Sequence, residues 1–406
     1  MEKKKICIIT PGKFPVPAVS GGAVETLLEN LIRQHKEDSN LEFVICSRYQ
    51  KEAFEAAKNM NLHNVRFAWT PPYSMIKAMK HIMFRVIRKF TKKSVWQFCD
   101  HYGEIKQLIL KEKFDLIIAE GGFHPYIMEI TQNYEKSKLA FHLHHHYNES
   151  YWPKRYGSLI GVSQFVTDRY VQECQEEIKP YVLKNGIDLE KFTNVLSEEE
   201  KNKLKRKFGI LPDDFVVLYS GRVTEVKGVK ELVQAVNQLE DPHIKLLVVG
   251  GSNFGKSKKT KYLRELEDIV KGNEDKIKLV GYVKSQDIYK FLNISHVQCI
   301  PSLWEEAAPL ALLEAMAAGV PTIVTDSGGM VEYVTKDTSI IVHRGEELIK
   351  EIKNAIIELK SDTERRKKMC DMARKHVQGY NQQHYYEAYI NIVEDILARG
   401  EKNGQK

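Results

Sequence analysis

The chain has few cysteines and no long apolar run. Its six cysteines are scattered over 406 residues without a CxxC pair, so neither a disulfide framework nor a cysteine zinc site is indicated. No apolar segment approaches the roughly 20 residues that span a bilayer, and the basic start is followed by a strand too short for a signal peptide. We therefore expect a cytoplasmic protein.

Acidic residues are missing from one long stretch of the chain. None lies between Glu55 and Asp100, where there are nine lysines and arginines. Within residues 75–93 apolar residues recur at helical spacing among these cations, a pattern typical of an amphipathic helix that docks on an anionic membrane surface. A domain helix whose apolar face is core fits equally well. The first interpretation would place the protein peripherally at the inner face of the plasma membrane.

The remainder of the chain alternates between strand-like and helix-like segments. The buried strand patterns Lys5–Thr10 and Phe215–Ser220 each open such a series, and the highly charged residues 197–210 lie between the two series. The alternation predicts parallel sheets wrapped by helices, which is an α/β fold. The net charge of +7 is modest, and we expect no nucleic-acid partner.

Each series contains a strand that is followed by a glycine loop. Gly21 and Gly22 precede a predicted helix, a geometry that lets the backbone approach a phosphate or sugar closely, although a plain turn fits as well. In the second series Gly221 and Arg222 follow the strand, and Lys227 lies just before the next helix. These fixed cations favour an anionic ligand at the second loop.

Two carboxylates flank the start of another predicted helix. Glu306 lies in the loop, Pro309 suits the first helical position, and the unpaired amides of Leu310 and Ala311 would favour an anion at this end. Because helical side chains lean toward the N-terminus, Glu314 can point at the same ligand. The alternative is a solvated carboxylate pair beside an ordinary buried helix.

Several histidines follow the predicted strand Leu139–Leu143. Alternation along a strand places His142, His144 and His146 on one face. A metal site is one interpretation, but no carboxylate or cysteine completes a plausible ligand set. We favour a histidine that offers a hydrogen bond to a substrate at the strand end, where open α/β sheets bind ligands.

Residues 250–257, GGSNFGKS, match the P-loop pattern directly after the strand Ile244–Val249. The helix that follows is predicted to begin several residues late, and no strand ending in a clear Walker B aspartate comes after it. These two features weaken the match, so we take a P-loop NTP-binding protein as the alternative function and not as the leading one.

A set of short motifs occurs in a definite order along the chain. In sequence order they are SGGAVE, a strand that ends in histidine, GVS, NGID, SGR with KG, PS, EEAAPLALLEAMAAGVP and SGGMVE. This ordered set resembles the retaining GT-B glycosyltransferases of family 4, the kind that builds bacterial surface glycans, over nearly the whole chain. The resemblance implies two Rossmann-like domains that face each other across a cleft, an acceptor-side domain over 1–195 and a nucleotide-sugar domain over 196–378. A C-terminal helix, 379–406, would pack back on the first domain.

The resemblance implies roles for four residues of the second domain. Glu314 would bind the ribose hydroxyls of a nucleotide sugar, Glu306 would lie near the donor sugar, and Arg222 and Lys227 would neutralise the diphosphate. No DxD pair occurs in the chain, so we expect no metal and no other cofactor beyond the nucleotide-sugar co-substrate. The reaction would retain the anomeric configuration, with a glycan or lipid-linked acceptor. A non-catalytic nucleotide-sugar binder is a further alternative.

In the first domain the resemblance implies that Gly22 approaches the diphosphate. It also matches His144, with His142 as the second choice, to the histidine that contacts the donor sugar. The chain departs from the family at Ala308 and Pro309, where an aromatic residue and a glycine are usual. Because proline has no N–H, one expected donor to phosphate is missing.

Overall fold

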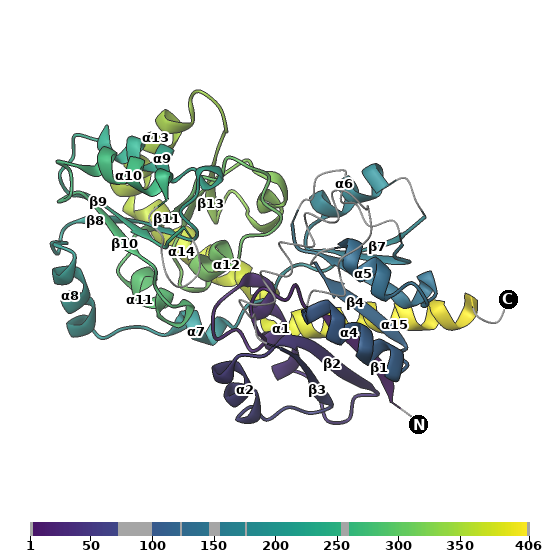
Figure 1. Cartoon of the computed structure of the whole chain (residues 1–406). Helices are drawn as coiled ribbons and strands as arrows, with labels where there is room; N and C mark the ends of the chain where they lie inside the picture. Colours follow the sequence, from purple (N-terminus) through teal and green to yellow (C-terminus); the bar gives the residue numbers. More distant parts are fainter. Residues whose placement is uncertain are drawn as a thin grey trace. The chain divides into compact units, whose positions relative to one another are not determined.

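The computed structural model describes residues 3–71, 100–121, 124–145, 155–174, 177–252 and 260–403. The chain divides into two compact units, Met1–Gly186 with Gln382–Lys406, and Ile187–Asn381 (Figure 1). The basic segment 75–93 lies outside the described residues.

The first unit is built on a seven-stranded sheet in the order β3-β2-β1-β4-β5-β6-β7, with every pair parallel. The central strands are almost wholly apolar and fully buried, as expected where helices cover both faces. The strands are β1 (Lys4–Ile9), β2 (Leu41–Arg48), β3 (Val65–Thr70), β4 (Leu116–Glu120), β5 (Leu139–Leu143), β6 (Ser158–Gly161) and β7 (Lys179–Val182).

Helices connect these strands, and the last helix of the chain joins them. They are α1 (Ala23–Arg33), α2 (Lys51–Lys58), α4 (Asp100–Lys111), α5 (His124–Ile130), α6 (Gln164–Cys174) and α15 (Gln382–Asn403). Helix α15 packs against α1 and against the 3-10 turn Lys136–Lys138. Its aromatic side chains are buried in the first unit, Tyr389 completely. The C-terminal segment therefore belongs to the unit in which the chain begins.

The second unit repeats this architecture with six parallel strands in the order β10-β9-β8-β11-β12-β13. The strands are β8 (Phe215–Ser220), β9 (Ile244–Val249), β10 (Ile277–Gly281), β11 (Val297–Ile300), β12 (Thr322–Thr325) and β13 (Ser339–Val342). The helices are α7 (Leu189–Thr193), α8 (Glu198–Lys207), α9 (Val229–Asn237), α10 (Lys261–Val270), α11 (Ile288–Asn293), α12 (Leu310–Ala317), α13 (Leu348–Ser361) and α14 (Thr363–His376).

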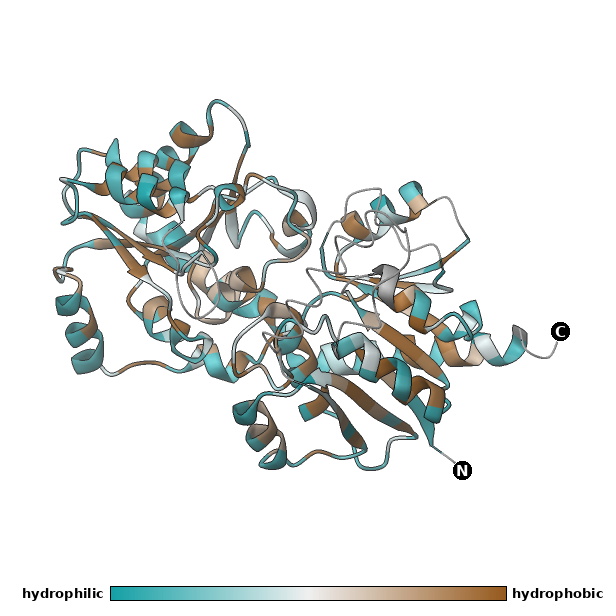
Figure 2. Cartoon of the chain, in the orientation of Figure 1, coloured by the Kyte–Doolittle hydropathy of each residue, from teal (hydrophilic) through white to brown (hydrophobic). Residues whose placement is uncertain are grey.

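The hydropathy of the chain follows this layering. In both units the central strands are apolar, and helices such as α1 and α9 combine an apolar stripe with a polar one, whereas α8 is almost wholly hydrophilic (Figure 2). In each sheet the strand order reverses once, between β1 and β4 in the first unit and between β8 and β11 in the second. Ligands of open α/β sheets bind beyond the carboxyl ends of the strands at such a reversal.

The α/β fold with two parallel sheets, predicted from the alternation of segments, is confirmed. One local prediction is wrong, because Pro309 is not the first residue of helix α12. It lies one position earlier, as the N-cap, with an extended backbone at φ −75° and ψ 121°. Gly319, just past the helix end, adopts the predicted left-handed conformation at φ 70°. Among the described helices, none is long and apolar enough to cross a membrane.

Leu312 of α12 is completely buried in the core of the second unit. Replacing it by alanine leaves a cavity, so Leu312→Ala should lower the free energy of unfolding of this unit by about 2–5 kcal/mol in urea titrations. Ile357→Ala is the control, because Ile357 on α13 is 48% exposed and its truncation should cost little. Equal small losses in both variants would contradict the packing of α12 described here.

Candidate active site

The loops that follow β8 and β11 leave the same edge of the second sheet. The two strands are neighbours, with Val217 opposite Val297 in the register. The loop after β8 contains Gly221, Arg222 and Lys227, and the loop after β11 contains Glu306. The structure therefore brings together four of the predicted site residues at the strand-order reversal.

Gly228 allows these two loops to touch. Its backbone is left-handed, at φ 66°, and it forms the N-cap of α9. A Cβ atom at this position would lie 1.8 Å from the carbonyl oxygen of Pro301, a distance that no side chain tolerates. Only glycine permits both the left-handed conformation and this close backbone approach.

The approach brings Lys227 onto Glu306. The ammonium group of Lys227 forms an ion pair with Oε1 of Glu306, and the hydroxyl of Ser302 donates to the same oxygen. Both side chains of the pair are largely buried, at 16% and 6% exposure. The ammonium also lies 5.0 Å from the centroid of the Trp304 ring, within cation–π range.

The backbone of Glu306 is held as firmly as its side chain. Its N–H donates to the hydroxyl of Ser327 at 2.8 Å, and its carbonyl accepts from the N–H of Gly329 at 2.7 Å. The Ser327 hydroxyl in turn donates to the carbonyl of Trp304 at 2.6 Å. The segment SGGMVE, which was recognised only as part of an ordered set of motifs, thus supports the loop that contains Glu306.

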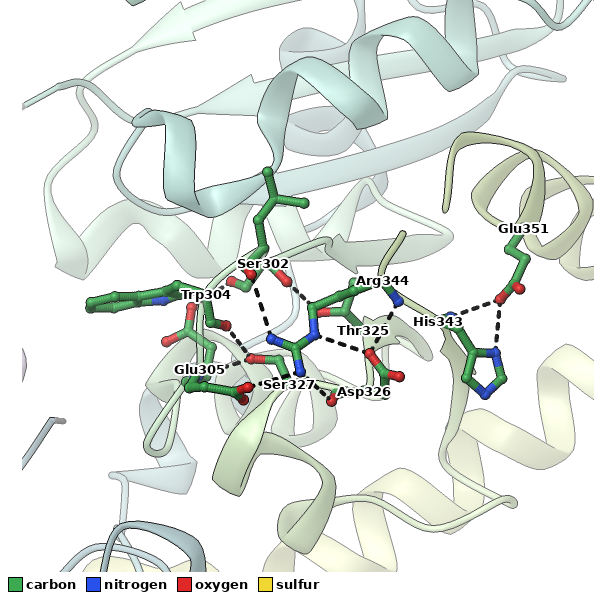
Figure 3. A network of polar contacts seen from close by, with 11 residues as sticks. Ser302, Trp304, Glu305, Thr325, Asp326, Ser327, His343, Arg344 and Glu351 are labelled. Carbon is green, nitrogen blue, oxygen red and sulfur yellow. Dashed lines mark hydrogen bonds and ion pairs between the residues drawn. The ribbon is translucent and has the colours of Figure 1, made fainter. Parts of the chain in front are cut away.

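Arg344, which follows β13, ties the same loop to the ends of β12 and β13 (Figure 3). Its guanidinium donates to the carboxylates of Glu305 at 3.0 Å and Asp326 at 3.1 Å. It also donates to the carbonyls of Asp326 at 3.2 Å and Leu303 at 3.4 Å. Glu305 is therefore occupied by Arg344, while its neighbour Glu306 pairs with Lys227. Sequence reasoning missed Arg344, which lies 38 residues beyond Glu306 and has no motif around it.

Helix α12 begins four residues after Glu306 and contains a carboxyl group and amides that have no described partners. Glu314 is half-buried, and burial raises its pKa to about 7, with Lys191 acting weakly in the opposite direction. No described group donates a hydrogen bond to its carboxylate, and no described acceptor takes the N–H of Leu310 or Ala311. Donors from a ligand would stabilise the ionised carboxylate, and an anion would satisfy the amides.

Arg222 directly follows Gly221 at the end of β8. Its side chain is exposed, and no described side chain pairs with the guanidinium. Its carbonyl accepts from the hydroxyl of Tyr219 at 2.6 Å, which fixes the backbone from which the side chain extends. A cation that pairs with no described side chain, in the same loop as Lys227, is available to an anionic ligand.

The beginning of the P-loop match is part of the sheet edge. The N–H of Gly250 donates to Gly281 at 2.8 Å, and the carbonyl of Gly251 accepts from Val223 at 3.0 Å. Helix α10 begins only at Lys261, after the N-cap Thr260. Residues 253–259 lie outside the described residues. The late helix agrees with the expectation from the sequence, because a P-loop requires a helix N-terminus at its GKS.

The predicted glycine loop of the first unit caps helix α1. Gly21 and Gly22 have φ angles of 78° and 113°, and Gly22 is the N-cap. A Cβ atom on Gly22 would lie 2.1 Å from Oε2 of Glu25, so glycine makes room for that carboxyl group. Burial raises the pKa of Glu25 to about 7. Gly21 and Gly22 belong to the first unit. Arg222, Lys227, Glu306 and Glu314 belong to the second.

The histidines at the end of β5 have a carboxylate partner. Oε2 of Glu120, the last residue of β4, lies 2.9 Å from Nδ1 of His142 and 2.7 Å from Nε2 of His144. The expectation that no carboxylate accompanies these histidines is therefore wrong. Adjacent parallel strands end at the same edge, so the pattern LIIAE followed by LAFHLH could have revealed Glu120. His146 lies outside the described residues.

Residues 200–376 match the sequence model of the family described as glycosyl transferases group 1. This span contains Arg222, Lys227, Glu306 and Glu314, with the loops that hold them together. The match covers 177 of the 406 residues, all of them in the second unit, and it identifies this part of the chain as a group 1 glycosyltransferase domain.

Curated relatives named as glycosyltransferases agree with this match. The chain is 25% identical over 337 residues to the lipopolysaccharide 1,2-N-acetylglucosaminetransferase of Salmonella typhimurium, covering 82% of this chain and 83% of the relative. It is 24% identical over 399 residues to the putative glycosyltransferase YtcC of Bacillus subtilis, covering 92% and 88%.

Solved structures share the fold across almost the whole chain. Anabaena HepE, determined in complex with UDP and glucose, superposes with a TM-score of 0.73 at 18% identity, over 97% of this chain and 100% of that one. WaaG, a glycosyltransferase involved in lipopolysaccharide biosynthesis, gives 0.65 at 13% identity, over 96% and 98%. These likenesses establish the two-sheet GT-B fold.

The role of Gly228 can be tested against a matched glycine. Gly209 has nearly the same φ, 67° against 66°, but an added Cβ there would meet nothing within 4 Å. Gly209→Ala should therefore cost only the left-handed strain of about 1–2 kcal/mol, whereas Gly228→Ala should cost more and should also displace Lys227. Urea unfolding and a crystal structure of each variant measure the two effects. Equal destabilisation by the two substitutions would show that the loops do not depend on this contact.

Proposed function

We propose that this glycosyltransferase transfers a sugar from a nucleoside diphosphate sugar to a hydroxyl group of a glycan or lipid-linked acceptor. The observation that supports it best is the meeting of Lys227, Glu306 and the start of α12 at the strand-order reversal, beside the unpaired Arg222. Cations and free amides at one point suit a diphosphate, and a buried carboxylate beside them suits the attached sugar.

The proposed mechanism stabilises the leaving group. Breaking the bond between sugar and phosphate adds negative charge to the diphosphate, so Arg222, Lys227 and the α12 amides favour the transition state over the ground state. The ammonium of Lys227 is paired with the carboxylate of Glu306. We infer that the diphosphate shares this ammonium, with Glu306 left beside the donor sugar. Pro309 offers no N–H, so Leu310 and Ala311 supply the helix-end donors.

Glu314 is proposed to bind the ribose. Its carboxylate has no hydrogen-bond donor among the described residues, and the two hydroxyls of a ribose would supply a pair of them. In the first unit, Gly21 and Gly22 would offer backbone to the diphosphate, and His144 would contact the sugar. Configuration would be retained by a front-face path in which the leaving phosphate helps to deprotonate the acceptor. No metal is required in this scheme, because the two cations take its place.

The identity of the acceptor rests on relatives. The lipopolysaccharide N-acetylglucosaminetransferase and the Staphylococcus aureus capsular polysaccharide enzyme CapM, 27% identical over 253 residues, are named for cell-surface glycans. We propose an acceptor of this class, met at the inner face of the plasma membrane by a cytoplasmic enzyme. The basic segment 75–93 would be the membrane contact, although it lies outside the described residues.

Removing the phosphate cations should abolish transfer. Arg222→Ala and Lys227→Ala should each lower the rate of nucleoside diphosphate release by about a hundredfold or more, as expected for groups that act on transition-state charge. UDP-, GDP- and TDP-sugars are tested with lipid-linked acceptors. Arg264→Ala on α10 is the control, because this exposed arginine belongs to neither of the two site loops nor to α12, and its loss should change nothing.

Three outcomes would count against the function. Wild-type rates in Arg222→Ala would remove that residue from the mechanism. Binding of a nucleotide sugar without turnover, with every acceptor, would favour the non-catalytic binder. Loss of activity or of ATP binding in Lys256→Ala would favour the P-loop alternative, since the proposed glycosyltransferase site does not use Lys256.

Binding of a nucleotide sugar should depend on pH through Glu314. The pKa of the free carboxyl is raised to about 7, and ribose hydroxyls stabilise its ionised form, so the pKa falls on binding. Affinity should therefore be greatest above pH 7 and should weaken as the pH falls below it. The affinity is measured by calorimetry with UDP-glucose, because the terminal phosphate of UDP itself titrates and would add a second pH dependence. Glu314→Gln should bind weakly and without this pH dependence, and an unchanged pH profile in the variant would exclude Glu314 as its source.

A further inference from the structure

Glu120 is a buried carboxylate for which the proposed mechanism has no use. Its side chain is 1% exposed at the end of β4, and its Oε2 atom contacts His142 and His144 of the neighbouring strand. Among the described residues its other oxygen, Oε1, accepts no hydrogen bond, and the 2.9 Å contact between Oε2 and Nδ1 of His142 lacks hydrogen-bond geometry. A charge held this deeply needs partners of fixed geometry.

The contact with His144 determines where the proton of that ring lies. The separation of 2.7 Å between Nε2 and Oε2 is a hydrogen bond. Burial lowers the pKa of His144 to about 4, and contacts with His142 and His144 outweigh burial and lower the pKa of Glu120 to about 2. Near neutral pH the pair is thus a neutral ring and a carboxylate. Since a carboxylate only accepts, the single ring proton is on Nε2, and Nδ1 is an acceptor.

We propose that Glu120 is a positioning residue that holds His144 as the Nε2–H tautomer, so that Nδ1 accepts a hydrogen bond from a hydroxyl of the bound sugar. The proposal rests on the function inferred above, in which His144 contacts the sugar. Glu120 acts through His144 and does not itself touch substrate. A neutral acceptor at this position orients a sugar hydroxyl without adding charge near the anomeric carbon.

Aromatic side chains hold the pair in place. The rings of His142 and His144 lie 4.1 Å apart, and the ring of Tyr389 lies 6.3 Å from that of His142. Burial and the charge of Glu120 raise the pKa of the Tyr389 phenol well above its usual value. Tyr389 comes from α15, so the C-terminal helix forms part of the wall around Glu120. In such surroundings no bulk water competes for the carboxylate.

The same three side chains could hold a metal ion, since each offers a ligand atom within 4.8 Å of the others. The proposed hydrogen bond and a bound metal ion exclude one another. The hydrogen bond requires a proton between Nε2 of His144 and Oε2 of Glu120, which lie 2.7 Å apart, whereas a metal ion would bind both atoms in place of that proton. A protein purified without added metal should therefore contain no stoichiometric zinc or other transition metal.

The direct test is the tautomer of His144, read from long-range ¹H–¹⁵N correlations of ¹⁵N-histidine-labelled full-length protein and assigned with His144→Ala. The wild type should show the Nε2–H form. In Glu120→Gln the amide can donate to Nε2, so the signal should move toward the Nδ1–H form. His101 is an internal reference, because Nε2 and Nδ1 of its ring contact the carbonyl of Thr10 and the hydroxyl of Thr70, and it should not change.

Kinetics separate positioning from folding. With UDP-glucose as donor, Glu120→Gln should lower kcat at least tenfold, as a wrong tautomer does elsewhere, while the Kd of UDP stays unchanged. Adding Glu120→Gln to His144→Ala should cause no further loss, because Glu120 acts through that ring. Asp214→Asn is the matched control. It also neutralises a buried carboxylate paired with a histidine, His243 at 3.1 Å, but before β8 and away from the site, and kcat should persist.

Four results would overturn the proposal: an Nδ1–H tautomer in the wild type, wild-type kcat in Glu120→Gln, additive losses in the double variant, or one bound transition metal per chain. A wild type that turns over no donor sugar would instead refute the proposed function. The tautomer measurement would still decide the role of Glu120, because it needs no substrate.

Discussion

The contact between Gly228 and Pro301 is the constraint on which the second unit's site depends. A glycine in the left-handed region, with the carbonyl of Pro301 where a Cβ would be, lets the loop after β8 touch the loop after β11. Only then can Lys227 reach Glu306. A buried lysine and a buried glutamate would each be costly alone, and together with Ser302 they satisfy one another. The pair therefore fixes the position of the Lys227 ammonium in this loop.

The surrounding polar network fixes the loop from behind. Arg344 and Ser327 bind its backbone and Glu305, so the side chain of Glu306 has few ways to move. By contrast, Arg222 and Glu314 have no described side-chain partners and are the groups left for a ligand. Groups that hold the loop are hydrogen-bonded to one another, and groups that would bind a ligand are not. A preorganised binding site has this arrangement, because the loop is already ordered by folding and need not be ordered again on binding.

Much of this could be predicted from the sequence. Alternating buried strands and helices predicted the parallel sheets, and Gly319 predicted the end of α12. Pro309 was misplaced by one residue, because its φ of −75° suits a first helical residue while its ψ of 121° is that of an extended backbone. Arg344 and Glu120 were missed for a different reason. Each meets its partners only through the packing of neighbouring strands, over 39 and 24 residues of chain. The ends of two adjacent strand patterns could have indicated the contact of Glu120, whereas Arg344 lies in no motif.

The central claim is that the ammonium of Lys227 is shared between Glu306 and the diphosphate of the donor. Calorimetric titration of UDP into Glu306→Gln and Lys227→Met tests it most directly. If the claim holds, Glu306→Gln frees the ammonium and binds UDP at least as tightly as the wild type, although transfer is lost, whereas Lys227→Met binds it weakly. Equal weakening of UDP binding in both variants would contradict the account.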